Sequence, residues 1–246
     1  MRYVALATDY DGTIAKDGDV DQATLAALQR WRDSGRQLIL ITGRRFDDLL
    51  TVFSAVDQFD WVVTENGATL YKPASQQQIL LGEPPSLEFV QVLRDRIDAA
   101  DLSLDAVPSE EFRRLLRDRV VKRLEVGQVI VATWEPYLAI VEATIIEMEV
   151  QSQIILNKGA LMILPQGVDK AAGLLTVLEQ LHTDPAAVIG VGDAENDVIF
   201  LKRCGYSVAV ANALPSVKQQ VDWVTSGDRG IGVQELIERF IDDAND

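Results

Sequence analysis

The sequence predicts an α/β protein with a Rossmann-like parallel-sheet core and an inserted α+β domain. In the first and last thirds of the chain, short apolar runs alternate with segments of helical periodicity. Such runs are typical of central strands in a parallel sheet that is covered on both faces. Between about residues 82 and 164 this alternation gives way to patterns of antiparallel strands and helices. We therefore expect a core built from 1–81 and 165–246, with an insert over 82–164.

The first core segment opens with a strand that leads into two carboxylates. Tyr3–Ala7 is apolar and rich in β-formers, and Asp9 and Asp11 follow it directly. The residues after it predict a helix over Gln22–Asp33, a strand over Gln37–Ile41, a helix over Phe46–Val56, a strand over Trp61–Thr64, and a hairpin turn with a short strand over 66–71. The polar stretch from Gln76 to Pro85 predicts a linker.

The insert is expected to contain helices and a sheet of its own. Ser86 is a suitable N-cap for a helix that runs to about Ala100. The remaining patterns predict a helix over Ser109–Arg117, antiparallel strands within Arg119–Trp134, a helix over Pro136–Gln151, and a hairpin over Gln153–Leu164 that turns at Asn157-Lys158-Gly159.

The α/β alternation resumes in the last part of the chain. The expected elements are a helix from Asp169 to Leu181, a strand over Ala187–Val191, a helix over Asp197–Arg203, a strand over Tyr206–Val210, and a helix over Val233–Asp243.

Composition narrows the classes of partner. The 38 acidic and 23 basic residues give a formal net charge of −15, which argues against nucleic-acid binding. A phosphorylated substrate remains compatible, because a bound cation reverses the local charge. The single cysteine, Cys204, is expected in the core, and the single histidine, His182, on the surface. No apolar stretch reaches the length of a membrane span and no signal-peptide pattern is present, so we expect a cytoplasmic protein without a membrane partner.

Carboxylates also follow a second apolar run near the C-terminus. The segment 188–197 reads as a buried strand that leads into Asp193 and Asp197. If the two strands are parallel neighbours, these residues meet Asp9 and Asp11 at one edge of the sheet. Hard oxygen ligands of this kind suit Mg²⁺. The alternative is that Asp193 and Asp197 only cap the following helix.

Two further positions suit phosphate binding. Thr42-Gly43-Arg44 places a hydroxyl and a backbone N–H at the end of the second strand, where a phosphate oxygen could bind. Lys170 opens a helix, where a positive charge gains nothing from the helix dipole. The alternatives are that Thr42 caps the next helix and that Lys170 is an ordinary surface lysine.

Together these segments resemble the four ordered motifs of the haloacid dehalogenase superfamily. The motifs are Asp9-Tyr10-Asp11-Gly12-Thr13, Thr42-Gly43-Arg44, Lys170, and the segment from Gly192 to Asp197. The long form of the last motif, Glu65-Asn66-Gly67-Ala68 and the late insert resemble the Cof-like phosphatases. That branch includes sucrose-phosphate and archaeal phosphoglycolate phosphatases.

The resemblance implies a role for each motif. Asp9 would be the nucleophile and Asp11 the general acid and base. Mg²⁺ would be held by Asp9, the backbone carbonyl of Asp11, and Asp193, with Asp197 or Asn196 in support. The phosphoryl oxygens would be held by Thr42, Gly43 and Lys170. The insert would be a cap that selects the leaving group; candidate substrate contacts are Arg44, Arg45, Asn66 and Lys158, although Lys158 is equally expected to be a solvated hairpin-tip lysine.

The resemblance thus implies a Mg²⁺-dependent phosphatase that acts on a small phosphorylated metabolite, of the sugar phosphate or phosphoglycolate type, through an aspartyl-phosphate intermediate. A phosphomutase of the same fold and a non-catalytic phosphate-sensing module are the alternatives. We expect a monomer or a homodimer.

Overall fold

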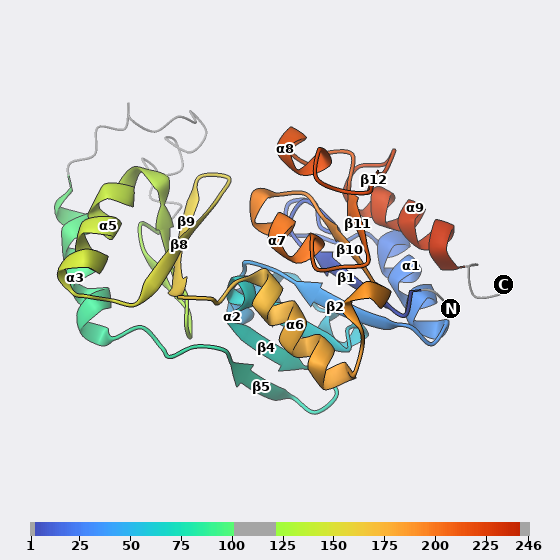
Figure 1. Ribbon diagram of the computed structural model, residues 1–246, viewed down its shortest axis with the longest axis horizontal. Coiled ribbons are helices and arrows are strands. Elements are labelled where there is room, and N and C mark those ends of the chain that lie inside the picture. The colour runs from blue at the N-terminus through green and yellow to red at the C-terminus, as the bar shows by residue number, and fades with distance from the viewer. Residues whose placement is uncertain (1–2, 101–121, 242–246) are drawn as a thin grey trace. The chain divides into compact units, whose positions relative to one another are not determined.

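The computed structural model describes residues 3–100 and 122–241. It divides the chain into two compact units, one formed by Met1–Leu81 and Val168–Asp246 and the other by Gly82–Gly167. Below, the first is called the core unit and the second the insert unit. Each is described by itself (Figure 1).

The described part of the core unit is built on an eight-stranded sheet with the order β12-β11-β10-β1-β2-β3-β4-β5. All neighbours are parallel except the pairs β3–β4 and β4–β5, which are antiparallel. The predicted parallel α/β core is therefore confirmed. The strands are β1 (Ala5–Asp9), β2 (Gln37–Ile41), β3 (Trp61–Thr64), β4 (Thr69–Lys72), β5 (Gln77–Leu80), β10 (Val188–Gly192), β11 (Tyr206–Ala209) and β12 (Trp223–Val224).

Helices cover this sheet in two pairs: α1 packs against α9, and α6 against α7. Asp21 is the N-cap residue of α1 (Gln22–Asp33), and its side chain accepts the N–H of Thr24. The other helices of the core unit are α2 (Phe46–Val52), α6 (Lys170–Leu181), α7 (Val198–Leu201), α8 (Pro215–Lys218) and α9 (Arg229–Ile241). The inner faces of these elements and the central strands share one hydrophobic core.

The insert unit has a four-stranded sheet in its described residues, in the order β6-β7-β9-β8, with every pair antiparallel. The helices α3 (Leu87–Ala99) and α5 (Leu138–Glu147) pack against one another and share a second hydrophobic core with this sheet. Its strands are β6 (Glu125–Val126), β7 (Val131–Trp134), β8 (Ser152–Asn157) and β9 (Ala160–Pro165).

Some element predictions were wrong in their bounds. Gln77–Leu80, expected within a linker, forms the edge strand β5, because its backbone pairs with β4 despite its polar side chains. The helix predicted over Phe46–Val56 ends at Val52, and a separate 3₁₀ turn follows. The helix predicted to reach Gln151 ends at Glu147, whereas the final helix begins at Arg229, four residues early. The helix expected over Ser109–Arg117 lies outside the described residues.

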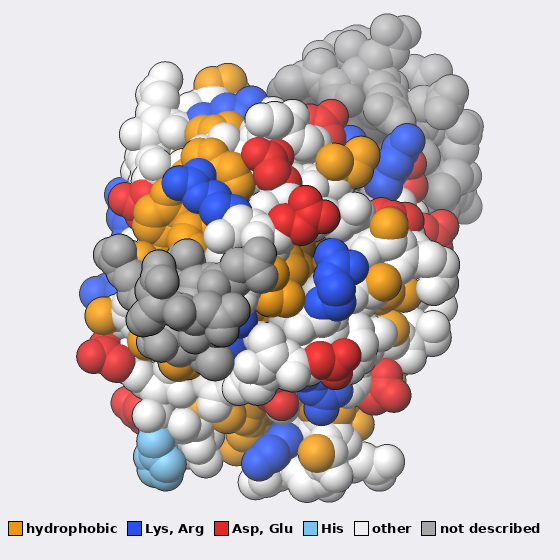
Figure 2. Space-filling view, turned by 90° about the vertical axis from the view of Figure 1, so that its right-hand side faces the viewer, with side chains coloured by type: hydrophobic (Ala, Val, Ile, Leu, Met, Phe, Trp, Pro, Cys, Tyr) orange, Lys and Arg blue, Asp and Glu red, His pale blue; other side chains and the backbone are white. Residues whose placement is uncertain are grey.

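The surface shows acidic and basic side chains interspersed with apolar ones on the face drawn in Figure 2. His182 is exposed, as expected. It is the C-cap residue of α6 and has a left-handed backbone conformation. Cys204 packs against the core, and burial raises the pKa of its thiol to about 12. Among the described residues, no helix is both long enough and apolar enough to cross a membrane.

A tight turn joins β3 to β4 and lies against the start of α6. Glu65, Asn66 and Gly67 all have positive φ angles, of 52°, 55° and 108°. A Cβ atom on Gly67 would lie 1.9 Å from the carbonyl oxygen of Asp169. Only glycine therefore allows the turn to approach the N-terminus of α6 this closely.

We predict that Gly67→Ala lowers the free energy of unfolding by about 3 kcal/mol or more, because it adds a steric clash to an unfavourable φ angle. The midpoint of thermal unfolding should fall by about 10 °C. Gly159→Ala is a matched control, since Gly159 has a φ of 85° at the β8–β9 turn and no heavy atom within 4 Å of the added Cβ. Equal losses in the two variants would show that the contact with Asp169 is not tight.

Candidate active site

The site lies where the carboxyl ends of β2, β1 and β10 meet. Asp9 is the last residue of β1 and pairs with Ile41, the last residue of β2. On the other side, Thr8 pairs with Val191 in parallel register. The residues that follow each strand therefore come together at one edge of the sheet, as the predicted neighbouring strands required.

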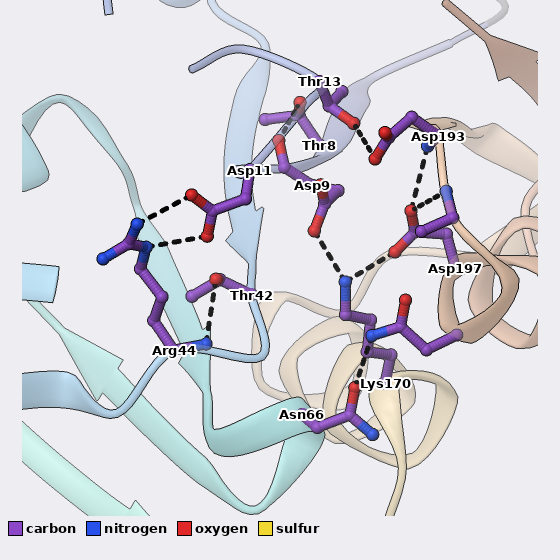
Figure 3. A network of polar contacts seen from close by, with 12 residues as sticks. Thr8, Asp9, Asp11, Thr13, Thr42, Arg44, Asn66, Lys170, Asp193 and Asp197 are labelled. Carbon is purple, nitrogen blue, oxygen red and sulfur yellow. Dashed lines mark hydrogen bonds and ion pairs between the residues drawn. The ribbon is translucent and has the colours of Figure 1, made fainter. Parts of the chain in front are cut away.

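A buried ion cluster connects β1, α6 and the loop after β10. The Nζ atom of Lys170 donates to Oδ1 of Asp9 at 2.6 Å and to Oδ1 of Asp197 at 2.5 Å (Figure 3). The three side chains are only 1%, 6% and 0% exposed, in the order Lys170, Asp9, Asp197. Lys170 is thus no surface lysine; α6 places it at its first residue, directed at the carboxylates.

Carboxylates outnumber the ammonium group in this cluster. Asp9, Asp193 and Asp197 each offer an oxygen, and these atoms all lie within 4.8 Å of one another. Burial first, and then the charge of Asp197, raise the pKa of Asp9 to about 8 despite Lys170. Burial alone would lower the pKa of Lys170, but the charges of Asp197 and Asp9 outweigh it and raise that pKa, so Lys170 stays protonated.

The donor set fits a divalent cation with a preference for oxygen. Three buried carboxyl groups lie close together beside one ammonium group. Carboxylate oxygens are the ligands that Mg²⁺ prefers in proteins. Both oxygens of Asp197 already accept hydrogen bonds, one from Lys170 and the other from backbone N–H groups.

Asp197 organises the loop after β10. Its Oδ2 accepts the backbone N–H groups of Asp193 and Ala194, both at 2.9 Å, while its Oδ1 accepts from Lys170. Asp197 ends the 3₁₀ turn Glu195–Asp197 and accepts the N–H of the residue before that turn, but its side chain makes no capping bond to the following helix α7. Its contacts hold the backbone of Asp193 in place beside Lys170.

Contacts that sequence reasoning missed join the loop after β1 to the loops after β10 and β11. The hydroxyl of Thr13 donates to Oδ1 of Asp193 at 3.4 Å. The side chain of Asn212 donates to the carbonyl oxygen of Gly12 at 2.8 Å and accepts the N–H of Arg229 at 2.7 Å. Thr13 lies inside a predicted motif and could have been chosen, whereas no sequence signal marks Asn212, which lies 200 residues from Gly12.

Asp11 contacts Arg44 and is not part of the carboxylate cluster. Its two oxygens accept from Nε and Nη2 of Arg44 at 2.7 and 2.8 Å. A third nitrogen of this guanidinium, Nη1, donates to Asp48 at 2.7 Å. The side chain of Asp11 is 46% exposed, and that of Arg44 is 23% exposed. Asp11 therefore lies at the open side of the site, in a bidentate ion pair (Figure 3).

The loop after β2 provides a hydroxyl beside this pair. Thr42 is buried, and its Oγ1 accepts the N–H of Arg44 at 3.1 Å. It does not cap the next helix, because the N-cap residue of α2 is Arg45 and α2 has no side-chain capping bond. The hydroxyl proton has no acceptor among the described residues, so it remains available for a ligand oxygen. Gly43 lies between these residues with its backbone N–H at the end of β2.

The remaining predicted contact residues occupy three different places. Asn66 is buried, and its Oδ1 accepts from Nδ2 of Asn196 at 2.9 Å. Arg45 forms a longer ion pair of 3.7 Å with Asp47. Lys158 belongs to the insert unit, at the turn between β8 and β9, with a φ of 48°.

Comparison with known proteins places the chain in a family. The family model of haloacid dehalogenase-like hydrolases matches residues 6–107 and 116–237. The chain therefore belongs to the haloacid dehalogenase-like hydrolases, as its motifs implied.

Particular relatives share nearly the whole chain. It is 27% identical to phosphoglycolate phosphatase 2 of Saccharolobus solfataricus, over 97% of this chain and 92% of the relative. It is 28% identical to the phosphoglycolate phosphatase of Methanothermobacter thermautotrophicus, over 96% of this chain and 98% of the relative.

Solved structures share the fold at lower identity. A haloacid dehalogenase-like hydrolase from Bacteroides thetaiotaomicron is 22% identical, covers 96% of this chain and 99% of its own, and has a TM-score of 0.75. A subclass IIB sugar phosphatase is 18% identical, covers 96% of this chain and 98% of its own, and has a TM-score of 0.70.

The raised pKa of Asp9 predicts a pH-dependent stability in metal-free protein. When the pKa of a carboxyl group is higher in the folded than in the unfolded state, the folded protein loses stability as the pH rises from the lower to the higher pKa. For Asp9 this range runs from 3.8 to about 8. Asp9→Asn removes this loss, so at pH 7.5 with EDTA the variant should unfold about 3–8 °C above the wild type, with a smaller gap at pH 5.

Thermal unfolding at both pH values measures the effect. Added Mg²⁺ should raise the unfolding temperature of the wild type more than that of Asp9→Asn, because the variant lacks one carboxylate ligand. A variant less stable than the wild type at pH 7.5 would show instead that the Asp9–Lys170 attraction exceeds the repulsion among the carboxylates.

Proposed function

We propose that the protein is a Mg²⁺-dependent phosphatase that hydrolyses a small phosphorylated metabolite through an aspartyl-phosphate on Asp9. The observation that carries this proposal is the buried Lys170 between Asp9 and Asp197, with Asp193 within 4.8 Å at the end of the neighbouring strand. A buried cluster with an excess of carboxylates costs stability, so its presence favours a catalytic role. The phosphoglycolate phosphatase relatives support a phosphorylated substrate.

Asp9 would act as the nucleophile. One carboxylate oxygen attacks phosphorus, an O–P bond forms, and the bond from phosphorus to the leaving oxygen breaks. Water then attacks the same phosphorus, so that inorganic phosphate leaves and the Asp9 carboxylate is restored. Lys170 contacts Asp9 at 2.6 Å and would keep this carboxylate oriented as the dianionic substrate approaches.

Asp11 would transfer the protons in both steps. It lies two residues from Asp9 on the open side of the site, where a leaving group has room. It would give a proton to the leaving alkoxide in the first step and take one from the attacking water in the second. The hydroxyl of Thr42 and the N–H of Gly43 would donate to the phosphoryl oxygens, together with Lys170.

The cation would be held by the carboxylates of Asp9 and Asp193 and by the backbone carbonyl of Asp11, with Asp197 and Asn196 in support. When bound, Mg²⁺ neutralises negative charge on the phosphoryl oxygens. The insert unit would serve as the cap, with Lys158 on one of its turns, and the enzyme would act in the cytoplasm.

Turnover tests the proposal. Phosphate release from phosphoglycolate, several sugar phosphates and p-nitrophenyl phosphate should require Mg²⁺ and stop with EDTA. Asp9→Asn should lower kcat by about 10⁴-fold or more, because the variant lacks the attacking oxygen.

Asp33→Asn is the matched control, since Asp33 is an exposed residue of α1. Among the described residues, its side chain accepts a hydrogen bond only from Gln29. It should retain wild-type turnover. Near-normal activity of folded Asp9→Asn would rule out the nucleophile, and retention of the phosphoryl group with transfer to a sugar phosphate would indicate a mutase.

A further inference from the structure

We propose that Arg44 determines specificity by binding a carboxylate on the leaving group in place of Asp11, which makes α-phosphooxy carboxylates such as phosphoglycolate the preferred substrates. This inference rests on the proposed phosphatase function and on the assignment of Asp11 to the leaving oxygen. It begins from the bidentate contact at 2.7 and 2.8 Å between Arg44 and Asp11.

Arg44 is fixed by contacts that do not depend on Asp11. Its Nη1 donates to Asp48 of α2 at 2.7 Å. Its backbone N–H donates to Oγ1 of Thr42, and its carbonyl oxygen accepts the N–H of Glu65 at 2.8 Å. The guanidinium carbon also lies 5.6 Å from the centre of the Tyr10 ring. The guanidinium would therefore keep its place if Asp11 turned away from it.

Asp11, in contrast, is the partner that can move. Its side chain is 46% exposed, and among the described residues its side-chain hydrogen bonds are the two from Arg44. To contact a leaving oxygen, Asp11 must turn at least one of its oxygens towards the substrate. This movement would expose the Nε and Nη2 atoms of Arg44, which form the flat fork that a carboxylate fits.

The distance from the leaving oxygen to the guanidinium limits where the substrate can carry its carboxylate. When Asp11 bonds Arg44 and first reaches the leaving oxygen, two successive hydrogen bonds place the guanidinium nitrogens within roughly 6 Å of that oxygen. A carboxylate one carbon away from that oxygen can span this distance. A second phosphate could also fit the fork, but a carboxylate matches the group that the fork already binds.

Charge favours an exchange of partners. Arg44 already faces two carboxylates, Asp11 and Asp48, at hydrogen-bond distance. A third carboxylate would add repulsion unless one of the two withdrew. Asp48 lies in the first turn of α2, four residues after Arg44 in the chain, so Asp11 is the partner that the substrate would displace.

A matched pair of substrates tests the inference. Phosphoglycolate and 2-hydroxyethyl phosphate differ only in a carboxylate against a hydroxymethyl group. The wild type should prefer phosphoglycolate by on the order of 10²-fold in kcat/KM. In Arg44→Gln this preference should fall to a few-fold, because turnover of phosphoglycolate should fall more than turnover of 2-hydroxyethyl phosphate.

Two further variants separate the fork from the charge. Arg44→Lys keeps a positive charge without the flat fork and should give an intermediate preference. It also provides the test if Arg44→Gln fails to fold. Arg30→Gln removes one exposed arginine from α1 and should keep the full preference.

A binding measurement is independent of turnover. In calorimetry, the wild type should bind 3-phosphonopropionate, which cannot be hydrolysed, about 10²-fold more tightly than propylphosphonate. Arg44→Gln should bind the two equally. A preference for the carboxylate that survives Arg44→Gln and Arg44→Lys, or a wild type without a preference, would overturn the inference.

The failures of the two proposals are distinguishable. If the wild type hydrolyses 2-hydroxyethyl phosphate and p-nitrophenyl phosphate with the same kcat/KM as phosphoglycolate, the role of Arg44 is overturned and the phosphatase function stands. A folded wild type that hydrolyses none of them overturns the phosphatase, and the inference with it.

Discussion

The contact of Lys170 with Asp9 and Asp197 is the interaction on which the site depends. It joins the end of β1, the start of α6 and the loop after β10 through one buried ammonium group. Burying an ammonium and several carboxylates is costly unless each is paired, and here carboxylates are in excess. Replacing a buried ion pair by apolar side chains of similar volume often leaves a protein equally stable or more stable. The arrangement is therefore understandable as a site prepared to receive more positive charge and then a phosphoryl group.

The backbone near this cluster is held in an unusual conformation. Three successive residues, Glu65 to Gly67, adopt positive φ angles, and their N–H groups reach back to the loop after β2: Glu65 to Arg44 and Asn66 to Thr42. Gly67 meanwhile lies against the peptide before Lys170. The turn thus fixes the distance between the expected phosphate-binding hydroxyl and the ammonium. Unfavourable backbone conformations of this kind concentrate at functional sites, where neighbouring contacts hold them in place.

The sequence predicted the features that follow from strand order and residue type. Apolar runs located β1, β2 and β3, and parallel pairing then brought Asp9 and Asp193 together. It did not predict β5, because an edge strand with polar side chains has no burial pattern to reveal it. Nor did it predict that Asp11 pairs with Arg44 and lies apart from the other carboxylates. That pairing depends on side-chain directions between segments 33 residues apart, which neither periodicity nor spacing encodes.

The pairing of Asp11 also changes where specificity can arise. Relatives named for phosphoglycolate and a structural neighbour named as a sugar phosphatase share this fold, so their difference must lie beyond the phosphoryl group. In the proposed mechanism, Asp9, Lys170 and the cation would contact only the phosphoryl group, which all such substrates have in common. If Asp11 contacts the leaving oxygen as proposed, the next side chain towards the variable part of the substrate would be Arg44, which already binds a carboxylate. Discrimination can therefore begin within the core unit itself, from a residue three positions beyond the end of β2.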